Sequence, residues 1–286
     1  MPHANFFNRK DGSMKDIQLL ALDCDGTLVN DDGRITERTQ RALIAAQQQG
    51  LTVALVSGRP RTGFHYEIDA LQLHQHHGLI GAYNGGLVLD VTSGETCFKK
   101  GIDVEEARAF LTALARFDIT YMIDYDGKLY TNTPENQYVK HEYSAHRLEL
   151  VYAPTLHETI DFNPVKILLT QDPDYIDDIA DDIDVLCGET LSTIRSTPFY
   201  LEITARGVNK SNALDHICQA IGISKAHVAA FGDQLNDMEM LRDAGIGVAM
   251  GNATPEVKAI ADIVTHDNNH NGIATVVEQI LDARTQ

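Results

Sequence analysis

Residues Ile17–Thr27, IQLLALDCDGT, join a short apolar run to a pair of aspartates. An almost continuous apolar run of this length is typical of a strand that is buried on both faces of a parallel sheet. Asp23 and Asp25 are two positions apart, so in extended chain their side chains point to the same side, and Gly26 lets the chain turn away. Ligands of open α/β sheets bind outside the carboxyl ends of the strands, which predicts a functional site here.

Strands and helices alternate on either side of this segment, which favours a fold of the α/β class with a Rossmann-like parallel sheet. Thr36 is a plausible N-cap of the first helix, and Gly50 and Gly222 are plausible ends of two helices. The predicted elements are a helix over 36–50, a strand over 52–57, a helix over 61–73 and a strand over 79–84, then a helix over 210–222, a strand over 227–233, a helix over 235–244 and strands over 245–250 and 261–265.

The middle of the chain has a different pattern, with mixed or alternating strands and helices near 104–117 and 173–183. It predicts a separate α+β domain inserted into the α/β domain. The predicted division assigns residues 14–86 and 201–286 to the core, 87–200 to the insert and 1–13 to a leader or an added extension.

The composition excludes some classes of binding partner and indicates where the protein is located. The 286 residues carry 23 Lys and Arg against 41 Asp and Glu, a formal charge of -18. Nucleic acids and anionic membranes bind proteins through basic side chains, so we expect neither as a partner. The chain has neither a secretory pattern at its start nor an apolar run of about 18 residues. Its four cysteines form no C-x-x-C pair, and together these features predict a cytoplasmic protein.

Two carboxylates that face a phosphate repel it, by about 4 kcal/mol for each pair of unit charges at 4 Å and an effective dielectric of 20. A hard cation such as Mg²⁺ offsets this repulsion and binds phosphate oxygens. A site of this kind therefore requires another carboxylate and a cationic side chain at neighbouring strand ends.

The second half of the chain supplies these groups. Asp233 ends a predicted strand, and Asn236 and Asp237 lie on the turn that follows. Lys210 begins a helix, where the helix dipole favours an anion, so a bound phosphate would relieve the conflict. Ser57 ends the strand over 52–57 and can offer its hydroxyl, with the backbone N–H groups around Gly58, to a phosphate oxygen.

Four segments resemble the ordered motifs of the haloacid dehalogenase-like hydrolase superfamily: DCDGT at 23–27, VSGR at 56–59, Lys210 within GVNKSNAL, and GDQLNDMEML at 232–241. NGG at 84–86, AMGNA at 249–253 and NNHNGIA at 268–274 resemble its Cof-type subfamily. The stretch NNHNG departs from the family, which more often has an acidic residue before the glycine. The resemblance covers both halves of the core and implies that the insert is an α/β cap domain.

The resemblance also implies roles by position. Asp23 is the nucleophile that becomes an aspartyl phosphate, and Asp25 is the general acid and then the base. Mg²⁺ is held by Asp23, by the backbone carbonyl of Asp25 and by Asp233. Ser57, Gly58, Lys210 and Asn236 bind the phosphoryl group, and Asp237 positions Lys210 or a metal-bound water.

A Mg²⁺-dependent phosphatase of small phosphorylated metabolites is the leading prediction, with sugar phosphates ahead of phosphorylated cofactors as substrates. A phosphotransferase or mutase would share the first half-reaction and stays open. A phospho-accepting signalling module fits less well, because such modules are shorter and lack a counterpart of Asp25. The oligomeric state is unknown from the sequence.

Two further features are interpreted as structural and not as functional sites. His74, His76 and His77 are predicted to lie on an exposed helix end, and Cys24 to be a packing residue. Hinges into the insert are expected near 85–87 and 200–205.

Overall fold

The structure is a computed structural model that describes residues 13–285, so the predicted leader lies outside the described residues except for Ser13. The chain forms two compact units. The first contains residues 13–58, 64–98 and 209–285, and the second contains residues 59–63 and 99–208. The predicted α/β fold class is confirmed, and each unit is built around its own sheet.

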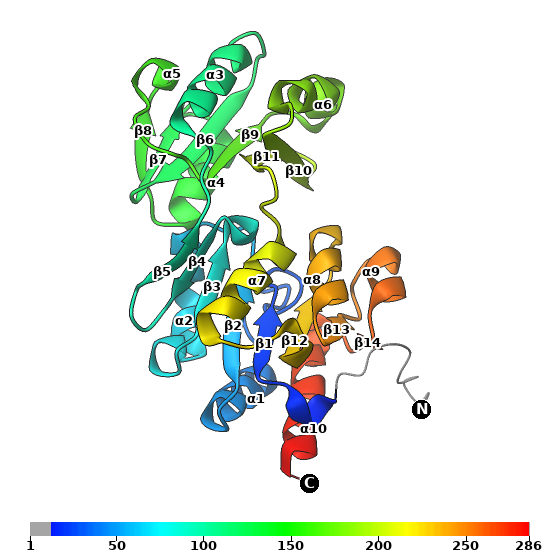
Figure 1. The fold of residues 1–286 in the computed structure, drawn as a ribbon. Helices are drawn as coiled ribbons and strands as arrows, with labels where there is room; N and C mark the ends of the chain where they lie inside the picture. Colours follow the sequence, from blue (N-terminus) through cyan, green and yellow to red (C-terminus); the bar gives the residue numbers. More distant parts are fainter. Residues whose placement is uncertain (1–12, 286) are drawn as a thin grey trace. The chain divides into compact units, whose positions relative to one another are not determined.

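The first unit contains an eight-stranded sheet with β1 near its middle, in the order β14-β13-β12-β1-β2-β3-β4-β5 (Figure 1). β1 pairs in parallel with β2 on one side and with β12 on the other, so their carboxyl ends meet at one edge. The strands are β1 (Leu19–Leu22), β2 (Thr52–Val56), β3 (Leu79–Ala82), β4 (Leu87–Asp90), β5 (Thr96–Lys99), β12 (Val228–Gly232), β13 (Ile246–Ala249) and β14 (Ile263–Val264).

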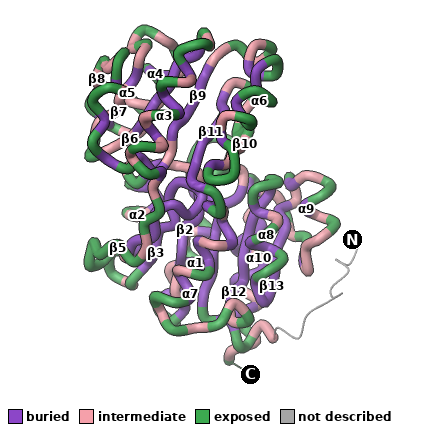
Figure 2. Tube along the Cα trace, turned by 45° about the horizontal axis from the view of Figure 1, so that its top comes forward, coloured by how far each residue is buried: buried purple, intermediate pink, exposed green. Residues whose placement is uncertain are grey.

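Helices cover the sheet of the first unit, and β1, β3, β12 and β13 are buried along their whole length (Figure 2). One apolar cluster joins Leu19 of β1 and Val56 of β2 to Leu214 and Ile217, all fully buried, because apolar side chains face the sheet at helical spacing. The helices are α1 (Glu37–Gln48), α2 (His65–Ala70), α7 (Lys210–Ile221), α8 (Met238–Asp243), α9 (Pro255–Ile260) and α10 (Gly272–Thr285).

Two details of the first unit differ from the sequence analysis. The single helix predicted over 61–73 is instead a 3-10 turn over Arg61–Phe64 followed by the short α2, because the chain enters the left-handed region at Gln72. Thr36 precedes α1 as predicted, but its hydroxyl donates to Asn271 and makes no capping bond.

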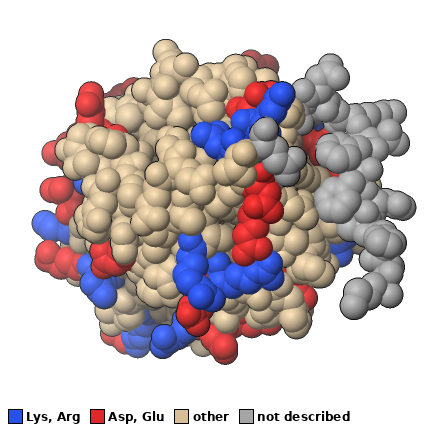
Figure 3. Space-filling view, turned by 90° about the horizontal axis from the view of Figure 1, so that it is seen from below, with Lys and Arg blue, Asp and Glu red and all other residues tan. Residues whose placement is uncertain are grey.

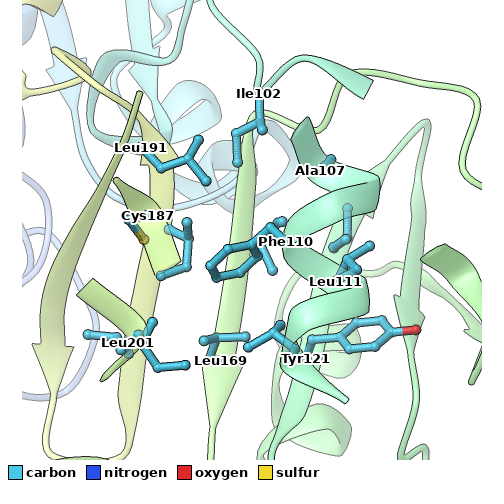
Figure 4. Packing of buried hydrophobic residues seen from close by; sticks show 14 of the residues in the cluster. Ile102, Ala107, Phe110, Leu111, Tyr121, Leu169, Cys187, Leu191 and Leu201 are labelled. Atoms are coloured by element: carbon cyan, nitrogen blue, oxygen red, sulfur yellow. The ribbon is translucent and has the colours of Figure 1, made fainter. Parts of the chain in front are cut away.

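The second unit contains a six-stranded sheet in the order β10-β11-β9-β6-β7-β8. Its core packs Phe110 and Leu111 of α3 against Leu169 of β9 and Leu201 of β11 (Figure 4). The strands are β6 (Thr120–Tyr125), β7 (Lys128–Thr131), β8 (Glu149–Tyr152), β9 (Lys166–Thr170), β10 (Leu191–Thr197) and β11 (Tyr200–Ala205), and the helices are α3 (Val104–Leu114), α4 (Gln137–Ala145), α5 (Leu156–Thr159) and α6 (Pro173–Cys187).

The division between core and insert falls later than the predicted boundaries at 87 and 200. β4 pairs antiparallel with β3, so residues 87–98 belong to the core sheet. β11 is hydrogen-bonded to β9 and to β10, so residues 201–208 belong to the insert. A strand paired on both sides is held by two ladders and makes a poor hinge, which argues against the hinge predicted over 200–205.

Surface charges are mixed on the face shown in Figure 3, where Lys and Arg side chains lie beside Asp and Glu side chains on the described part of the surface. Within residues 13–285, every helix is too short or too polar to span a bilayer.

Candidate active site

Asp23 lies at the carboxyl end of β1, where its side chain is buried. The residue is 5% exposed, and its backbone N–H donates to the carbonyl of Phe231 on β12 at 3.0 Å. This bond continues the parallel pairing of β1 with β12 by one residue. Asp23 is therefore fixed beside the end of the strand that carries Asp233.

The ammonium group of Lys210 forms an ion pair with Asp23. Its Nζ lies 2.6 Å from Oδ1 of Asp23 and 2.6 Å from Oδ1 of Asp237, and the residue is 2% exposed. Asn209 caps the helix by accepting from the N–H of Asn212 at 2.7 Å. The structure therefore places Lys210 on the first turn of α7, between two carboxylates.

Asp233 and Asp237 belong to the turn that follows β12. Oδ2 of Asp237 accepts from the backbone N–H of Asp233 at 2.9 Å and of Gln234 at 3.0 Å. Oδ1 of Asp233 accepts from the hydroxyl of Thr27 at 2.9 Å, and its Oδ2 accepts from the Gln234 amide at 2.9 Å. These bonds hold the Asp233 carboxylate against the DCDGT loop.

Two glycines allow this close approach. A Cβ at Gly26 would lie 2.6 Å from Oδ2 of Asp233, and Gly26 has a φ of +78° that L side chains rarely adopt. A Cβ at Gly232 would lie 2.5 Å from the Cβ of Asp237. Larger residues at either position would separate the loops that bring the carboxylates together.

The electrostatics of this group are dominated by burial. Burial raises the pKa of Asp23 to about 8, an effect that Lys210 opposes and Asp237 reinforces. Burial also raises the pKa of Asp233, although the bond from Thr27 opposes this. For Lys210, burial lowers the pKa, but the attraction of Asp23 and Asp237 outweighs burial and leaves it raised. The raised pKa values of the two aspartates thus follow first from burial, and that of Lys210 from its two carboxylate partners.

The donor set fits a divalent cation. Carboxylate oxygens of Asp23, Asp233 and Asp237 lie within 4.8 Å of one another. Three negative charges and the ammonium of Lys210 leave a net charge of minus two, which one divalent ion would neutralise. Mg²⁺ prefers oxygen ligands. All three carboxylates also accept hydrogen bonds, Asp23 and Asp237 from Lys210, and Asp233 from Thr27 and Gln234.

The residues predicted to bind phosphate form a second group beside the first. Ser57, which directly follows β2, is buried, and its carbonyl accepts from the N–H of Asn84 at 2.9 Å. A Cβ at Gly58 would lie 3.2 Å from the Asn84 side chain, whose Oδ1 accepts from Nδ2 of Asn236 at 3.4 Å. Asn236 precedes Asp237 in the chain, so the two groups are joined at the turn after β12.

Asp25 is exposed, unlike the buried Asp23. Its backbone forms an isolated parallel bridge with Val29. A carboxylate on this exposed loop can exchange protons with substrate or water, as a general acid or base must.

Three polar residues of this region were not predicted as site residues. Thr27 and Gln234 hold Asp233, and Asn252 donates to the carbonyl of Gly26 at 2.8 Å. Thr27 and Asn252 lie in segments used for the family resemblance, DCDGT and AMGNA, which was the available signal. Their contacts join residues more than 200 positions apart, which local patterns do not reveal.

Cys24 and two of the three histidines lie as predicted. His74 and His77 are exposed near the 3-10 turn at Leu73–Gln75, whereas His76 is half-buried, and Cys24 is fully buried. Among residues 13–285, the acidic group around Asp23 is the cluster of potential metal ligands that the structure reveals.

Two phosphatases are similar in sequence to this chain over most of its length. The 5-amino-6-(5-phospho-D-ribitylamino)uracil phosphatase YcsE of Bacillus subtilis is 29% identical over 262 residues, 92% of this chain and 95% of the relative. The HMP-PP phosphatase of Cronobacter sakazakii is 30% identical over 245 residues, 85% of this chain and 87% of the relative.

Solved structures of related hydrolases have a similar fold. A haloacid dehalogenase-like hydrolase from Bacteroides thetaiotaomicron has a TM-score of 0.86 and 28% identity, covering 92% of this chain and 99% of that one. The subclass IIB sugar phosphatase BT4131 has a TM-score of 0.77 and 27% identity, covering 92% and 98%. The family of haloacid dehalogenase-like hydrolases itself matches residues 20–277. The chain therefore belongs to the haloacid dehalogenase-like hydrolase family, and within it to the phosphatases, as its motifs predicted.

Proposed function

We propose that the chain is a Mg²⁺-dependent phosphatase that hydrolyses small phosphorylated metabolites through an aspartyl phosphate on Asp23. One observation carries the proposal: the buried ammonium of Lys210 lies 2.6 Å from Asp23 and 2.6 Å from Asp237, beside a third carboxylate, Asp233. Burying an excess of negative charge costs folding free energy unless bound cations neutralise the excess. Its position at the carboxyl ends of β1 and β12 is where α/β sheets bind ligands.

In the first step, the carboxylate of Asp23 attacks phosphorus. A new bond forms between phosphorus and an oxygen of Asp23, while the bond to the ester oxygen breaks. Asp25 donates a proton to that oxygen, so the product leaves as a neutral alcohol. Lys210 holds Asp23 in place and stabilises the negative charge on the phosphoryl group.

In the second step, Asp25 takes a proton from water, and the water oxygen attacks phosphorus. The bond between phosphorus and Asp23 breaks, which releases phosphate and restores the carboxylate. Asp25 regains a proton in this step, so it is ready to act as the acid again. Asp25 is exposed, which suits a group that must give and take protons in turn.

The remaining residues bind the phosphoryl group and the metal. Ser57, Gly58 and Asn236 would donate hydrogen bonds to its oxygens, because they lie at the ends of β2 and β12 next to Asp23. Asp23, Asp233 and the backbone carbonyl of Asp25 would hold Mg²⁺. When bound, the ion neutralises excess negative charge of the carboxylates and of the phosphate.

Sugar phosphates are the first substrate class that we propose, because the sugar phosphatase BT4131 shares 27% identity over 92% of this chain. Phosphorylated cofactors and their precursors are the second, since two relatives are named for a phosphoribitylamino-uracil and for HMP-PP.

A panel of phosphorylated metabolites, assayed for free phosphate with Mg²⁺ and with EDTA, tests the proposal. We expect phosphate release from at least one member with Mg²⁺ and none with EDTA. Asp23→Asn should abolish release, whereas Asp32→Asn, the same change on an exposed residue nearby, should leave it unchanged. Residual activity of more than a few per cent in Asp23→Asn would reject Asp23 as the nucleophile. Transfer of phosphate to a second metabolite without release would instead support a phosphotransferase.

A further inference from the structure

An asparagine-rich loop near the end of the chain contacts the loop that carries Asp25. Asn269 donates from Nδ2 to Oδ2 of Asp31 at 3.1 Å, and its Oδ1 accepts from the N–H of Asp31 at 3.2 Å. Asn268 donates to Oδ1 of Asp31 at 3.2 Å. Both carboxylate oxygens of Asp31 and its backbone N–H are therefore held by two neighbouring amide side chains.

The same loop also holds Val29. Nδ2 of Asn268, a residue that is 6% exposed, donates to the carbonyl of Val29 at 3.0 Å. Val29 in turn forms the isolated backbone bridge with Asp25, and its N–H donates to the carbonyl of Cys24 at 3.0 Å. The bond from Asn268 therefore fixes the backbone segment that is paired with Asp25.

Asn252 extends this network to Gly26, the residue that follows Asp25. Its Oδ1 accepts from the N–H of Asn268 at 3.3 Å, and its Nδ2 donates to the carbonyl of Gly26 at 2.8 Å. The same Nδ2 lies 3.5 Å from Oδ2 of Asp233. Asn252, Asn268 and Asn269, here called the asparagine clamp, hold the Asp25 loop at Gly26, Val29 and Asp31.

We propose that the asparagine clamp positions Asp25 for proton transfer, an inference that rests on the proposed phosphatase function. The clamp residues are positioning residues, because they act on Asp25 through the loop backbone. Asp25 itself lies on an exposed part of this loop, unlike the buried Asp23. General acid catalysis requires the acid within hydrogen-bond reach of the leaving oxygen, so a small displacement of the loop weakens it.

The residue types of the clamp are suited to this role. An amide can donate to a carboxylate, whereas an acidic residue at position 269 would place a second negative charge about 3 Å from Asp31 and repel it. The amide groups of Asn268 and Asn269 therefore complement the carboxylate of Asp31.

Asn269→Asp tests the proposal, since Asn269 is exposed and the change is nearly isosteric. Two esters are compared: an alkyl phosphate from the active panel, whose leaving oxygen needs a proton, and p-nitrophenyl phosphate, whose leaving group needs little help. We expect kcat to fall about 10- to 100-fold for the alkyl ester, and less than about threefold for the aryl ester. The loss for the alkyl ester is at or below the lower end of the roughly 100- to 10,000-fold that general acid catalysis contributes, because Asp25 is displaced and not removed.

A second substitution restores the complementarity. In the double variant Asn269→Asp with Asp31→Asn, the amide and the carboxylate have exchanged places, so activity on the alkyl ester should return to within about threefold of the unaltered protein. Asp32→Asn removes a charge one residue along and should leave both esters unaffected. Both esters are assayed at saturating Mg²⁺, because the backbone carbonyl of Asp25 would also hold the ion and lies on the loop that the clamp contacts.

Equal losses for the two esters, or a double variant no better than Asn269→Asp, would overturn the positioning role. Amide hydrogen exchange of the segment 24–31 gives a readout that does not depend on turnover. Asn269→Asp should speed exchange there, and unchanged exchange would refute the clamp. Failure of the proposed function would look different, because the unaltered protein would then release no phosphate from either ester.

Discussion

Lys210→Met removes the buried ammonium between Asp23 and Asp237 and keeps an unbranched side chain of similar length. Breaking a buried ion pair by removing one partner costs about 3–5 kcal/mol. Here the ammonium lies 2.6 Å from each of two carboxylates, and oxygens of these two and of Asp233 lie within 4.8 Å of one another. We therefore expect a loss near the upper end of that range, about 4–5 kcal/mol of unfolding free energy without metal. Such a loss is a large part of a typical domain's stability of about 5–15 kcal/mol.

Urea unfolding in EDTA measures this loss, and Lys225→Met is the matched control. Nζ of Lys225 also contacts two carboxylates, those of Asp215 at 2.8 Å and Asp243 at 3.0 Å, but its side chain is 26% exposed. Ion pairs that reach solvent contribute about 0–1 kcal/mol, so the control should lose no more than about 1 kcal/mol.

Two further measurements separate charge from packing. Adding Asp237→Asn to Lys210→Met removes one of the uncompensated charges, so the double variant should recover about 1–2 kcal/mol relative to additive losses. Saturating Mg²⁺ should also narrow the gap between Lys210→Met and the unaltered protein, because the ion supplies positive charge to the same carboxylates. Losses at Lys210 no larger than at Lys225, or strict additivity with Asp237→Asn, would refute the electrostatic reasoning.

Two other predictions concern stability. A Cβ at Gly26 would lie 2.6 Å from Asp233, whereas Gly33 has a φ of +69° and nothing within 4 Å of such a Cβ. Gly33→Ala should therefore lose roughly 1–2 kcal/mol of unfolding free energy in urea through left-handed strain, and Gly26→Ala should lose more. Equal losses would argue against the close packing at Gly26. Burial raises the pKa of Glu142, but the contacts with His146, followed by those with Lys166 and Tyr200, outweigh burial and leave it lowered. A lowered folded pKa stabilises the protein above the unfolded value of about 4.3, and this contribution is lost as the pH falls through the folded pKa. Unfolding at pH 6 and at pH 3 should therefore show a larger deficit for Glu142→Gln at pH 6, and a deficit independent of pH would contradict this account.

The sequence predicted the core strands and the position of the site because both follow from local chemistry. β1 is a short apolar run that ends in aspartates, and parallel neighbours bring Ser57 and Asp233 to the same edge. Lys210 was identified by its unfavourable place on a helix N-terminus, and the structure pairs it with Asp23 and Asp237.

What the sequence did not predict depends on tertiary pairing. β4 and β5 have the mixed pattern of the insert. β4 pairs with β3 and β5 is the next strand after β4, which assigns both to the core sheet. α10 was not predicted, although its apolar residues such as Val277 are buried in the core. The asparagine clamp was also missed, because amide side chains that bond across more than 200 positions leave no periodic signal.

The central claim is that Asp23 attacks phosphorus beside a divalent ion shared with Asp233. A crystal structure with Mg²⁺ and orthovanadate tests it directly, because vanadate imitates a phosphoryl group under attack. We predict vanadium bonded to a carboxylate oxygen of Asp23, with Mg²⁺ about 2.0–2.1 Å from oxygens of Asp23 and Asp233. Vanadate bound away from Asp23, or Mg²⁺ that contacts neither Asp23 nor Asp233, would contradict it.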